Sequence, residues 1–259
     1  MTVNIAFLCT DGVVLAADSM LTTANERAPF GTGKGISRKL HAIGSDKLFT
    51  WSGEQGQAGR LRMYIELLAL PEPDCPHVLN HMLTLSESVL LSFEKTRSLG
   101  LIDCEAFLAF PYRGQLQCCA FKGAFQPCMM DADNYYMALG TGKQLADPFL
   151  KYITDLMCPR QPTVREAIFL SYWTILHVIN SGPGGVDHPI RIGTLTSDGA
   201  EAYVKVLGDT EIDDQQQAVA GLQDVLRKWR DQVSGSVEAE VSPPPQVRPR
   251  DGMPPSDSP

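Results

Sequence analysis

The sequence contains no apolar run long enough to cross a bilayer, and no charged segment followed by an apolar stretch and a cleavage site stands near its start. Basic residues are also few, because 22 Lys and Arg face 30 Asp and Glu and leave a net charge of -8. A surface that binds nucleic acid or anionic lipid needs clustered Lys and Arg. We predict a soluble, cytoplasmic protein that binds neither nucleic acid nor membrane.

The seven Cys and five His show no metal-ligand spacing. Cys118 and Cys119 are adjacent and would face opposite sides of a strand, so they are unsuited to share one metal. Most of the other Cys lie in apolar runs, which is typical of buried thiols in a reducing compartment. We predict no structural zinc and no other metal site.

The glycine-rich stretch GTGKG at 31–35 resembles part of a phosphate-binding loop. It lacks the preceding Gly of that motif, and Lys34 is followed by Gly35 instead of Ser or Thr. We therefore predict a flexible loop at 31–35, no bound nucleotide and no other cofactor. Any energy-dependent unfolding of a substrate would have to come from a separate ATPase.

The pattern of strands and helices predicts the fold class. The chain has 259 residues and 44% hydrophobic content, enough to bury one large core. Asp-Gly steps at Asp11-Gly12 and Asp198-Gly199 predict hairpins. Apolar residues spaced by three and four predict helices, and Thr163 with Glu166 forms a capping box. The predicted elements occupy residues 3–9, 12–18, 39–43, 47–52, 61–68, 78–93, 104–110, 115–121, 134–139 and 163–179. Their order predicts an α+β fold, a four-layer αββα sandwich.

The C-terminal part of the chain differs in composition from the body at 1–207. Apolar residues recur at alternating steps of three and four over 208–233, which predicts an amphipathic helix with a narrow seam. We expect this seam to pack on the body or on a neighbouring subunit. Residues 234–259 are rich in Ser, Pro and acidic residues, and we predict a disordered tail.

The chain opens with MTVNIAFLCTDGVVLAADS, in which a strand-like run begins at Thr2. Removal of Met1 would leave Thr2 with both a hydroxyl and a free α-amine. That amine has an unperturbed pKa of roughly 7.7–8.0, so it can accept a proton from the hydroxyl near neutral pH. Thr2 would then serve as nucleophile and base together. The alternative is that Thr2 is an ordinary strand residue.

Four segments resemble the active-site segments of proteasome β-type subunits, which are N-terminal threonine hydrolases, and of the related bacterial proteasome-homologue peptidase. TVNIAFLCTDGVVLAADS resembles the opening hairpin, with Asp18 at its acidic position. RKLHAI places Lys39 at the family's lysine, and LFTWSGEQGQ places Gly53 at the strand-to-helix junction. LGTGKQLADPFL resembles the later Gly-Ser-Gly loop, with Thr141 in the place of the serine. The resemblance covers about 1–207.

The resemblance implies a fold of the N-terminal-nucleophile hydrolase type and a role for each position. Asp18 would hold and polarise Lys39, which would stabilise the attacking alkoxide, and the Gly53 N–H would contribute to the oxyanion hole. Thr22 would pair with an extended peptide as an added strand. Trp51 would form the floor of the pocket for the residue before the cleaved bond, so this pocket would be shallow or closed. The alternative is that Trp51 faces the core, because strand alternation does not select its face.

The resemblance is interrupted at NSGPGG. Asn180 and Pro183 stand where the family commonly has Asp and Ser in a segment that orients the amine. Pro183 has neither a hydroxyl nor an N–H, so that network is not carried over. We expect reduced activity or a narrow substrate range.

Three functions fit these observations. The first is a threonine-type endopeptidase that acts on peptides or unfolded proteins inside a self-compartmentalising assembly of stacked rings. The second is a catalytically silent scaffold subunit with the same fold. The third is an N-terminal-nucleophile amidase that acts on a small molecule. The sequence fixes neither the ring size nor the physiological substrate, and it does not show whether an ATPase partner exists.

Overall fold

The computed structural model describes residues 2–24, 32–67, 77–94, 104–123, 125–182, 184–199 and 201–235. The chain divides into two compact units, 1–219 and 220–259, so the division falls within helix α5 (Asp209–Gly235). The predicted domain boundaries at 207 and 233 stay predictions. Nearly all of the predicted tail lies outside the described residues.

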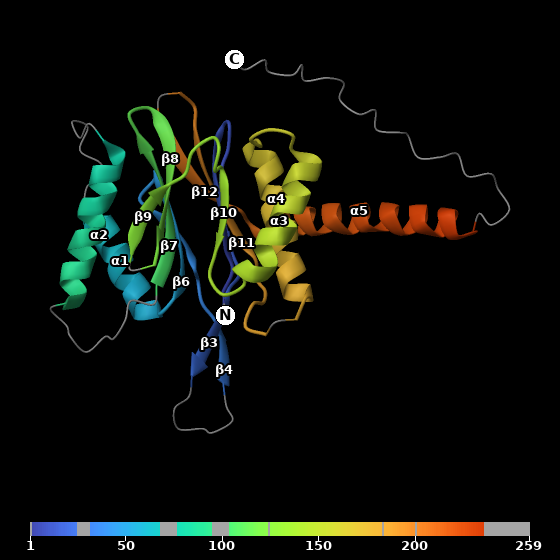
Figure 1. Cartoon of the computed structure of the whole chain (residues 1–259), viewed down its shortest axis with the longest axis horizontal. Coiled ribbons are helices and arrows are strands. Elements are labelled where there is room, and N and C mark those ends of the chain that lie inside the picture. The colour runs from blue at the N-terminus through green and yellow to red at the C-terminus, as the bar shows by residue number, and fades with distance from the viewer. Residues whose placement is uncertain are drawn as a thin grey trace, which may run out of the picture. The chain divides into compact units, whose positions relative to one another are not determined.

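The first unit contains two five-stranded antiparallel sheets that face each other (Figure 1). One sheet has the order β10 (Tyr136–Leu139), β1 (Asn4–Leu8), β2 (Gly12–Ala17), β11 (Arg191–Ser197) and β12 (Ala202–Val206). The other has the order β5 (Leu40–Ile43), β6 (Lys47–Gly53), β7 (Cys104–Tyr112), β8 (Gln115–Lys122) and β9 (Gln126–Met129). We refer to them as the β1 sheet and the β6 sheet.

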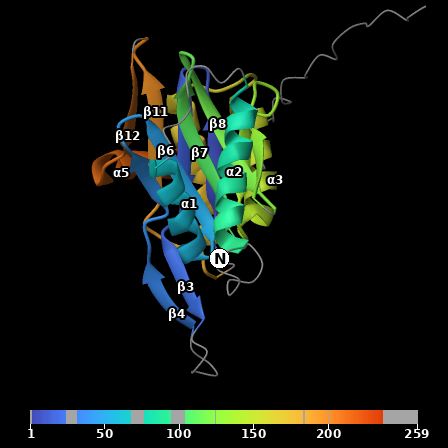
Figure 2. The ribbon, with the colours of Figure 1, turned by 90° about the vertical axis from the view of Figure 1, so that its left-hand side faces the viewer.

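Helix pairs cover the outer faces of both sheets. Helices α1 (Gln55–Leu67) and α2 (Val78–Glu94) lie in front of the β6 sheet in Figure 2. Helices α3 (Lys143–Met157) and α4 (Val164–Asn180) cover the β1 sheet (Figure 1). Helix α4 begins with the predicted capping box of Thr163 and Glu166. The predicted αββα sandwich is therefore confirmed.

Strand alternation sorts the side chains of each sheet into two layers. In β6, Leu48 belongs to the hydrophobic cluster between the sheets, whereas Phe49 belongs to the cluster under α1 and α2. In β1, Ala6 faces the other sheet, and Ile5 and Phe7 belong to the cluster under α3 and α4. Both faces of both sheets are thus buried, which explains why the strand runs are almost continuously apolar.

The β1–β2 hairpin carries the start of the chain. Its register pairs Leu8 with Val13 and Asn4 with Ala17, around the predicted turn at Asp11-Gly12. At the open end of the hairpin, Val3 N donates to Asp18 Oδ1 at 3.0 Å, and Asp18 N donates to Val3 O at 3.2 Å. The turn near residue 11 therefore determines that the segment of Thr2 lies beside Asp18.

The hairpin of β3 (Met20–Ala24) and β4 (Thr32–Ile36) differs from the prediction. It forms a separate two-stranded sheet that extends beyond the sandwich (Figures 1 and 2). The GTGKG stretch, predicted as a flexible loop, contributes four of its residues to β4. Its pairing with β3 uses backbone groups, which a side-chain pattern does not reveal. Strand β9 was also missed by the sequence analysis.

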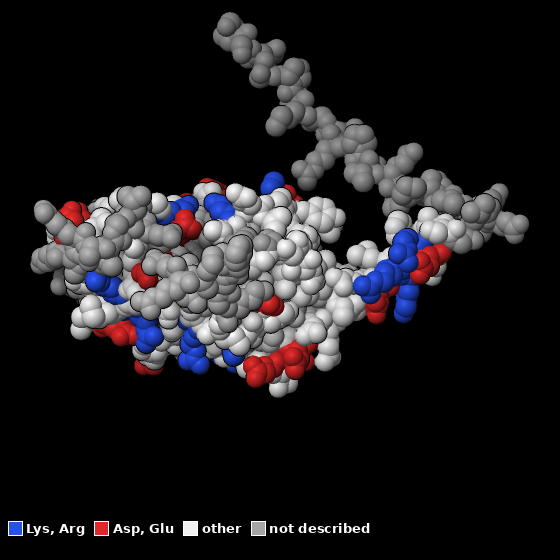
Figure 3. Space-filling model, turned by 90° about the horizontal axis from the view of Figure 1, so that it is seen from below, with Lys and Arg blue, Asp and Glu red and all other residues white. Residues whose placement is uncertain are grey.

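Charges of both signs lie close together on the described surface shown in Figure 3, where Lys and Arg side chains neighbour Asp and Glu side chains. Among the described residues, no helix combines the length and the hydropathy that a membrane crossing requires.

Candidate active site

The structure brings Thr2, Asp18 and Lys39 into direct contact. Lys39 Nζ donates to Thr2 Oγ1 at 2.8 Å and to the two carboxylate oxygens of Asp18 at 2.9 Å each. The side chains of Lys39 and Asp18 are 1% and 0% exposed. Three residues that are distant in the sequence thus form one buried, hydrogen-bonded group around the Thr2 hydroxyl.

Backbone groups fix the Asp18 carboxylate in this group. Asp18 follows the last residue of β2, and its two oxygens accept hydrogen bonds from Val3 N and Met20 N, each at 3.0 Å. Lys39 directly precedes β5, and its carbonyl accepts a hydrogen bond from Trp51 N at 3.2 Å. The ion pair therefore connects the start of the chain and β2 to the edge of the β6 sheet.

Burial changes the proton affinity of both charged groups. It lowers the pKa of Lys39 below its ordinary value, although the neighbouring Asp18 carboxylate opposes this shift. Burial likewise raises the pKa of Asp18, although Lys39 and the two backbone amides oppose this shift. Lys39 is therefore a better proton donor than an exposed lysine, and its ammonium points at the one hydroxyl that would carry negative charge during nucleophilic attack.

The loop Gly140-Thr141-Gly142 holds the backbone of Thr2 from the other side. Thr2 N donates to Thr141 Oγ1 at 3.1 Å, and Gly142 N donates to Thr2 O at 2.9 Å. Thr141 thus contacts the nitrogen that would become the α-amine, and its predicted role in the site stays a prediction. The loop follows β10, which pairs with β1 through Asn4 and Leu139.

Gly140 allows the close approach of this loop to Thr2. Its φ is 86°, in the left-handed region, and a Cβ at this position would clash with Thr2 O and lie 3.2 Å from Ser52 Cβ. A side chain would therefore require both an unfavourable backbone conformation and a displacement of the Thr2 carbonyl. Gly140 is a structural requirement of the site.

Gly140→Ala is expected to destabilise the fold more than Gly114→Ala. Gly114 also has a positive φ of 73°, but a Cβ there meets nothing within 4 Å. Backbone strain alone costs about 1–3 kcal/mol in both variants, whereas Gly140→Ala adds the clash with Thr2 O. Urea unfolding measures the difference. Equal free energies of unfolding for the two variants would show that the loop moves aside without cost.

Gly53 and Trp51 lie at the end of β6. Gly53 ends the strand with a φ of 95° and is exposed, and Ser52 beside it approaches Gly140. Trp51 is 4% exposed and belongs to the hydrophobic cluster that contains Ala58 of α1. The oxyanion role of Gly53 and the pocket role of Trp51 stay predictions. Trp51 also contributes to the core, which its substitution would weaken.

The remaining predicted positions, Thr22, Asn180 and Pro183, have no described contact with the buried group of Thr2, Asp18 and Lys39. Thr22 lies on β3, where its backbone pairs with Lys34 of β4, and its side chain is outside the described part of the structure. Asn180 is the last residue of α4. Pro183 lies outside the described residues, so the predicted loss of the amine-orienting network stays a prediction.

Glu105 is a residue of the site that sequence reasoning missed. Its Oε2 accepts a hydrogen bond from Gly140 N at 2.9 Å. The only signal in the sequence is that Glu105 is the one charged residue in the otherwise apolar strand CEAFLAFPY. A charged residue in such a strand requires a polar partner, but the sequence does not identify Gly140 as this partner.

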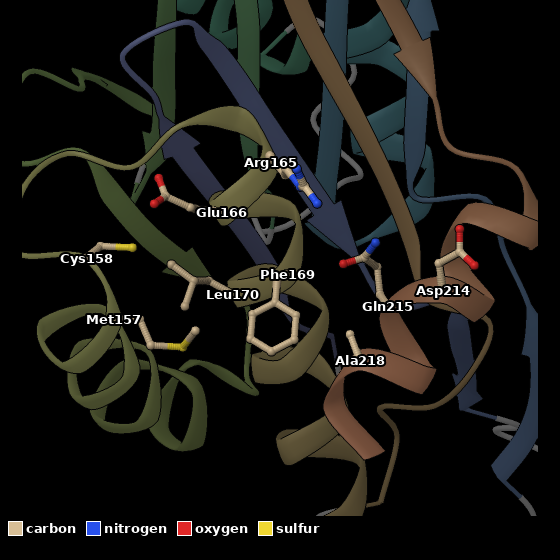
Figure 4. Close-up of a pocket in the computed structure, with 9 residues that line it drawn as sticks. All are labelled: Met157, Cys158, Arg165, Glu166, Phe169, Leu170, Asp214, Gln215 and Ala218. Atoms are coloured by element: carbon tan, nitrogen blue, oxygen red, sulfur yellow. The ribbon is translucent and has the colours of Figure 1, made fainter. Parts of the chain in front are cut away.

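A cleft of about 520 Å³ lies elsewhere in the first unit, among α3, α4 and the first part of α5 (Figure 4). Its lining includes Phe169, Leu170, Gln215 and Ala218, and none of the site residues above contributes to it. Among the described residues, no group of three or more His, Cys, Asp or Glu is placed to hold a metal ion.

Solved structures of the ancestral β-subunit, Anbu, resemble this chain over most of its length. The Anbu complex from Pseudomonas aeruginosa, described as a helical assembly, is 16% identical with a TM-score of 0.63, covering 95% of this chain and 99% of that one. Anbu from Yersinia bercovieri is 14% identical with a TM-score of 0.64, covering 87% and 96%. Anbu from Hyphomicrobium sp. strain MC1 is 18% identical with a TM-score of 0.61, covering 91% and 98%. No protein-family model and no curated protein matches the sequence.

These neighbours correct the resemblance drawn from the sequence. The structures named above are Anbu proteins, a proteasome-like fold but a distinct family, so the assignment to proteasome β-type subunits or the bacterial proteasome-homologue peptidase is wrong. The physical reason is that the segments around Thr2, Asp18 and Lys39 build the interior of the shared fold. They indicate the fold, but they do not separate its families. At these identities the likeness shows the fold alone.

Proposed function

We propose that the protein is a threonine-type hydrolase of amide bonds, with Thr2 as nucleophile and its α-amine as base after removal of Met1. The observation that supports this proposal is the contact of 2.8 Å between Lys39 Nζ and Thr2 Oγ1, inside a site where Asp18 neutralises the lysine. Burial of charged groups is costly, and a threonine with no catalytic role does not need a buried ion pair at its hydroxyl.

In the proposed mechanism, the α-amine takes the hydroxyl proton directly or through one water, and Oγ1 attacks the substrate carbonyl carbon. The Lys39 ammonium stabilises the developing negative charge on Oγ1, and the Gly53 N–H binds the carbonyl oxygen as it becomes an oxyanion. The ammonium of Thr2 then protonates the leaving amine. The resulting ester on Thr2 is hydrolysed by water, which restores the hydroxyl.

The proposed substrate is an extended peptide or an unfolded protein. The backbone of Thr22 on β3 would pair with it as an added strand, and Trp51 would limit the pocket for the residue before the cleaved bond. We also propose that copies of the chain associate into rings. The description of the P. aeruginosa relative as a helical assembly supports self-association and leaves open whether the rings close. A separate ATPase unfoldase remains part of the proposal.

A silent scaffold subunit is the second candidate function. The description of the Pseudomonas aeruginosa structure as a helical assembly favours this function, because it states assembly and no activity. The scaffold function requires neither the release of Met1 nor a reactive Thr2 hydroxyl. Release of Met1 and a reactive Thr2 hydroxyl therefore distinguish the hydrolase from the scaffold. They also distinguish an amidase that acts on a small molecule from the scaffold.

Intact mass spectrometry of the purified full chain tests the proposal. We expect a mass that corresponds to loss of Met1, followed by a single covalent adduct after treatment with a peptide epoxyketone, a probe that reacts with both the hydroxyl and the amine of an N-terminal threonine. Peptide mapping should place the adduct on Thr2. Retained Met1 together with no adduct would contradict the hydrolase and leave the scaffold function.

A further inference from the structure

Glu105 lies on the face of β7 that points at the β1 sheet. Its neighbours Cys104 and Ala106 belong to the cluster under α1 and α2, so alternation directs Glu105 to the opposite side. In the register of the β6 sheet, Glu105 is opposite Ser52. The carboxylate is thus placed beside the last residues of β6, where Ser52 approaches Gly140.

The hydrogen bond of Glu105 links the two sheets at the site. Glu105 belongs to the β6 sheet, whereas Gly140 follows β10 of the β1 sheet, and the bond between Oε2 and Gly140 N measures 2.9 Å. A backbone N–H that donates to a carboxylate forms a stronger bond than one that donates to a neutral oxygen. The half-buried position limits competition from water.

The loop that Glu105 holds makes both backbone contacts to Thr2. From Gly140, the chain continues to Thr141, whose hydroxyl accepts from Thr2 N, and to Gly142, whose N–H donates to Thr2 O. Lys39 holds the Thr2 hydroxyl, and neither Lys39 nor Asp18 forms a hydrogen bond to the Thr2 nitrogen in the described structure. The position of the nitrogen relative to the hydroxyl therefore depends on this loop.

We propose that Glu105 is a positioning residue, which fixes the Gly140-Thr141-Gly142 loop and through it the Thr2 nitrogen relative to Oγ1. The inference rests on the proposed function for its chemical consequence, because a base acts only when it is aligned with the proton it removes. Glu105 itself does not contact the substrate in this proposal. It acts through Gly140 and Thr141.

Two variants of Glu105 separate geometry from charge. Glu105→Gln keeps an oxygen that can accept from Gly140 N, whereas Glu105→Ala removes the acceptor. We expect Glu105→Ala to slow epoxyketone labelling of Thr2 by up to about a hundredfold, because misplacement of a reacting group lowers the rate on this scale. The maximal labelling rate should fall, while the probe concentration that gives half of this rate should not change. Glu105→Gln should label within about threefold of the unmodified chain.

Gln117→Ala is the matched control. Gln117 lies on β8 of the same sheet, and within the described residues its side-chain amide donates to Gln115 Oε1, at 3.5 Å, and not to the Gly140 loop. This variant should label at the rate of the unmodified chain. Equal labelling of Glu105→Ala and Gln117→Ala would overturn the inference, and so would equal slowing in Glu105→Gln and Glu105→Ala, because the glutamine would then fail to replace the acceptor.

Hydrogen exchange gives a readout that does not depend on activity. The amides of 140–142 should exchange faster in Glu105→Ala than in Glu105→Gln, with no change in β2. If the unmodified chain is not labelled at all, the proposed function is wrong, and exchange alone then decides whether Glu105 holds the loop. Unchanged exchange at 140–142 in Glu105→Ala would refute the positioning role in either case.

Discussion

Thr2→Ala is expected to abolish covalent labelling and turnover without unfolding the protein. The substitution removes Oγ1, the atom that forms the bond to the substrate carbonyl, so no ester can form. The fold should persist, because the hydrogen bonds of Thr2 to Thr141 and Gly142 use backbone atoms that alanine keeps. Lys39 also retains both oxygens of Asp18. Peptide hydrolysis, probe labelling and a urea unfolding curve measure these outcomes.

Thr2→Ser is the control for this prediction. Serine keeps a hydroxyl and the α-amine, so it should retain measurable labelling, while Thr2→Ala has none. Labelling of Thr2→Ala at the original rate would show that the probe reacts at another residue. Turnover that persists in Thr2→Ala would contradict the assignment of Thr2 as nucleophile, whatever the unfolding curves show.

Residue chemistry pointed to Thr2 alone, and the partners of Thr2 came from the resemblance, although local structure accounts for their contact. The Asp11-Gly12 step fixes the hairpin turn, and the strand register then places Thr2 beside Asp18 at the open end. Lys39 directly precedes a strand, so the edge of the second sheet carries it to the same end. Asp18 and Lys39 were singled out by the resemblance alone, which named the wrong family, and the strand register explains afterwards why they meet Thr2.

The features that were missed depend on contacts between distant segments. Glu105 and Gly140 are separated by 35 positions, and no side-chain pattern links a strand glutamate to a backbone N–H in another sheet. The β3–β4 hairpin is paired through backbone groups of a glycine-rich stretch, which offers no alternating pattern. For Trp51, alternation indicates two possible faces but does not select one, and only the packed structure assigns it to the cluster with Ala58.

Lys39→Ala is expected to lower the rate of hydrolysis or labelling by about 10²–10³-fold, because removal of one group that stabilises a developing charge typically costs about 2.7–4 kcal/mol. It should also lower the free energy of unfolding by about 3–5 kcal/mol, because Asp18 would remain as a buried carboxylate without its cation. The rate loss and the stability loss have different origins. Labelling kinetics and urea unfolding would measure them separately.

The double variant Asp18→Asn/Lys39→Met separates the two effects of losing Lys39. It removes both charges, so no uncompensated carboxylate stays buried, and its free energy of unfolding should lie closer to that of the unmodified chain than Lys39→Ala does. Its labelling rate should stay at least as low as that of Lys39→Ala, because no ammonium faces Thr2 Oγ1. If the double variant recovers activity together with stability, Lys39 serves the fold alone, and another group must stabilise the alkoxide. If Lys39→Ala is slow while the double variant is stable and equally slow, the lysine acts on the chemistry of Thr2 itself.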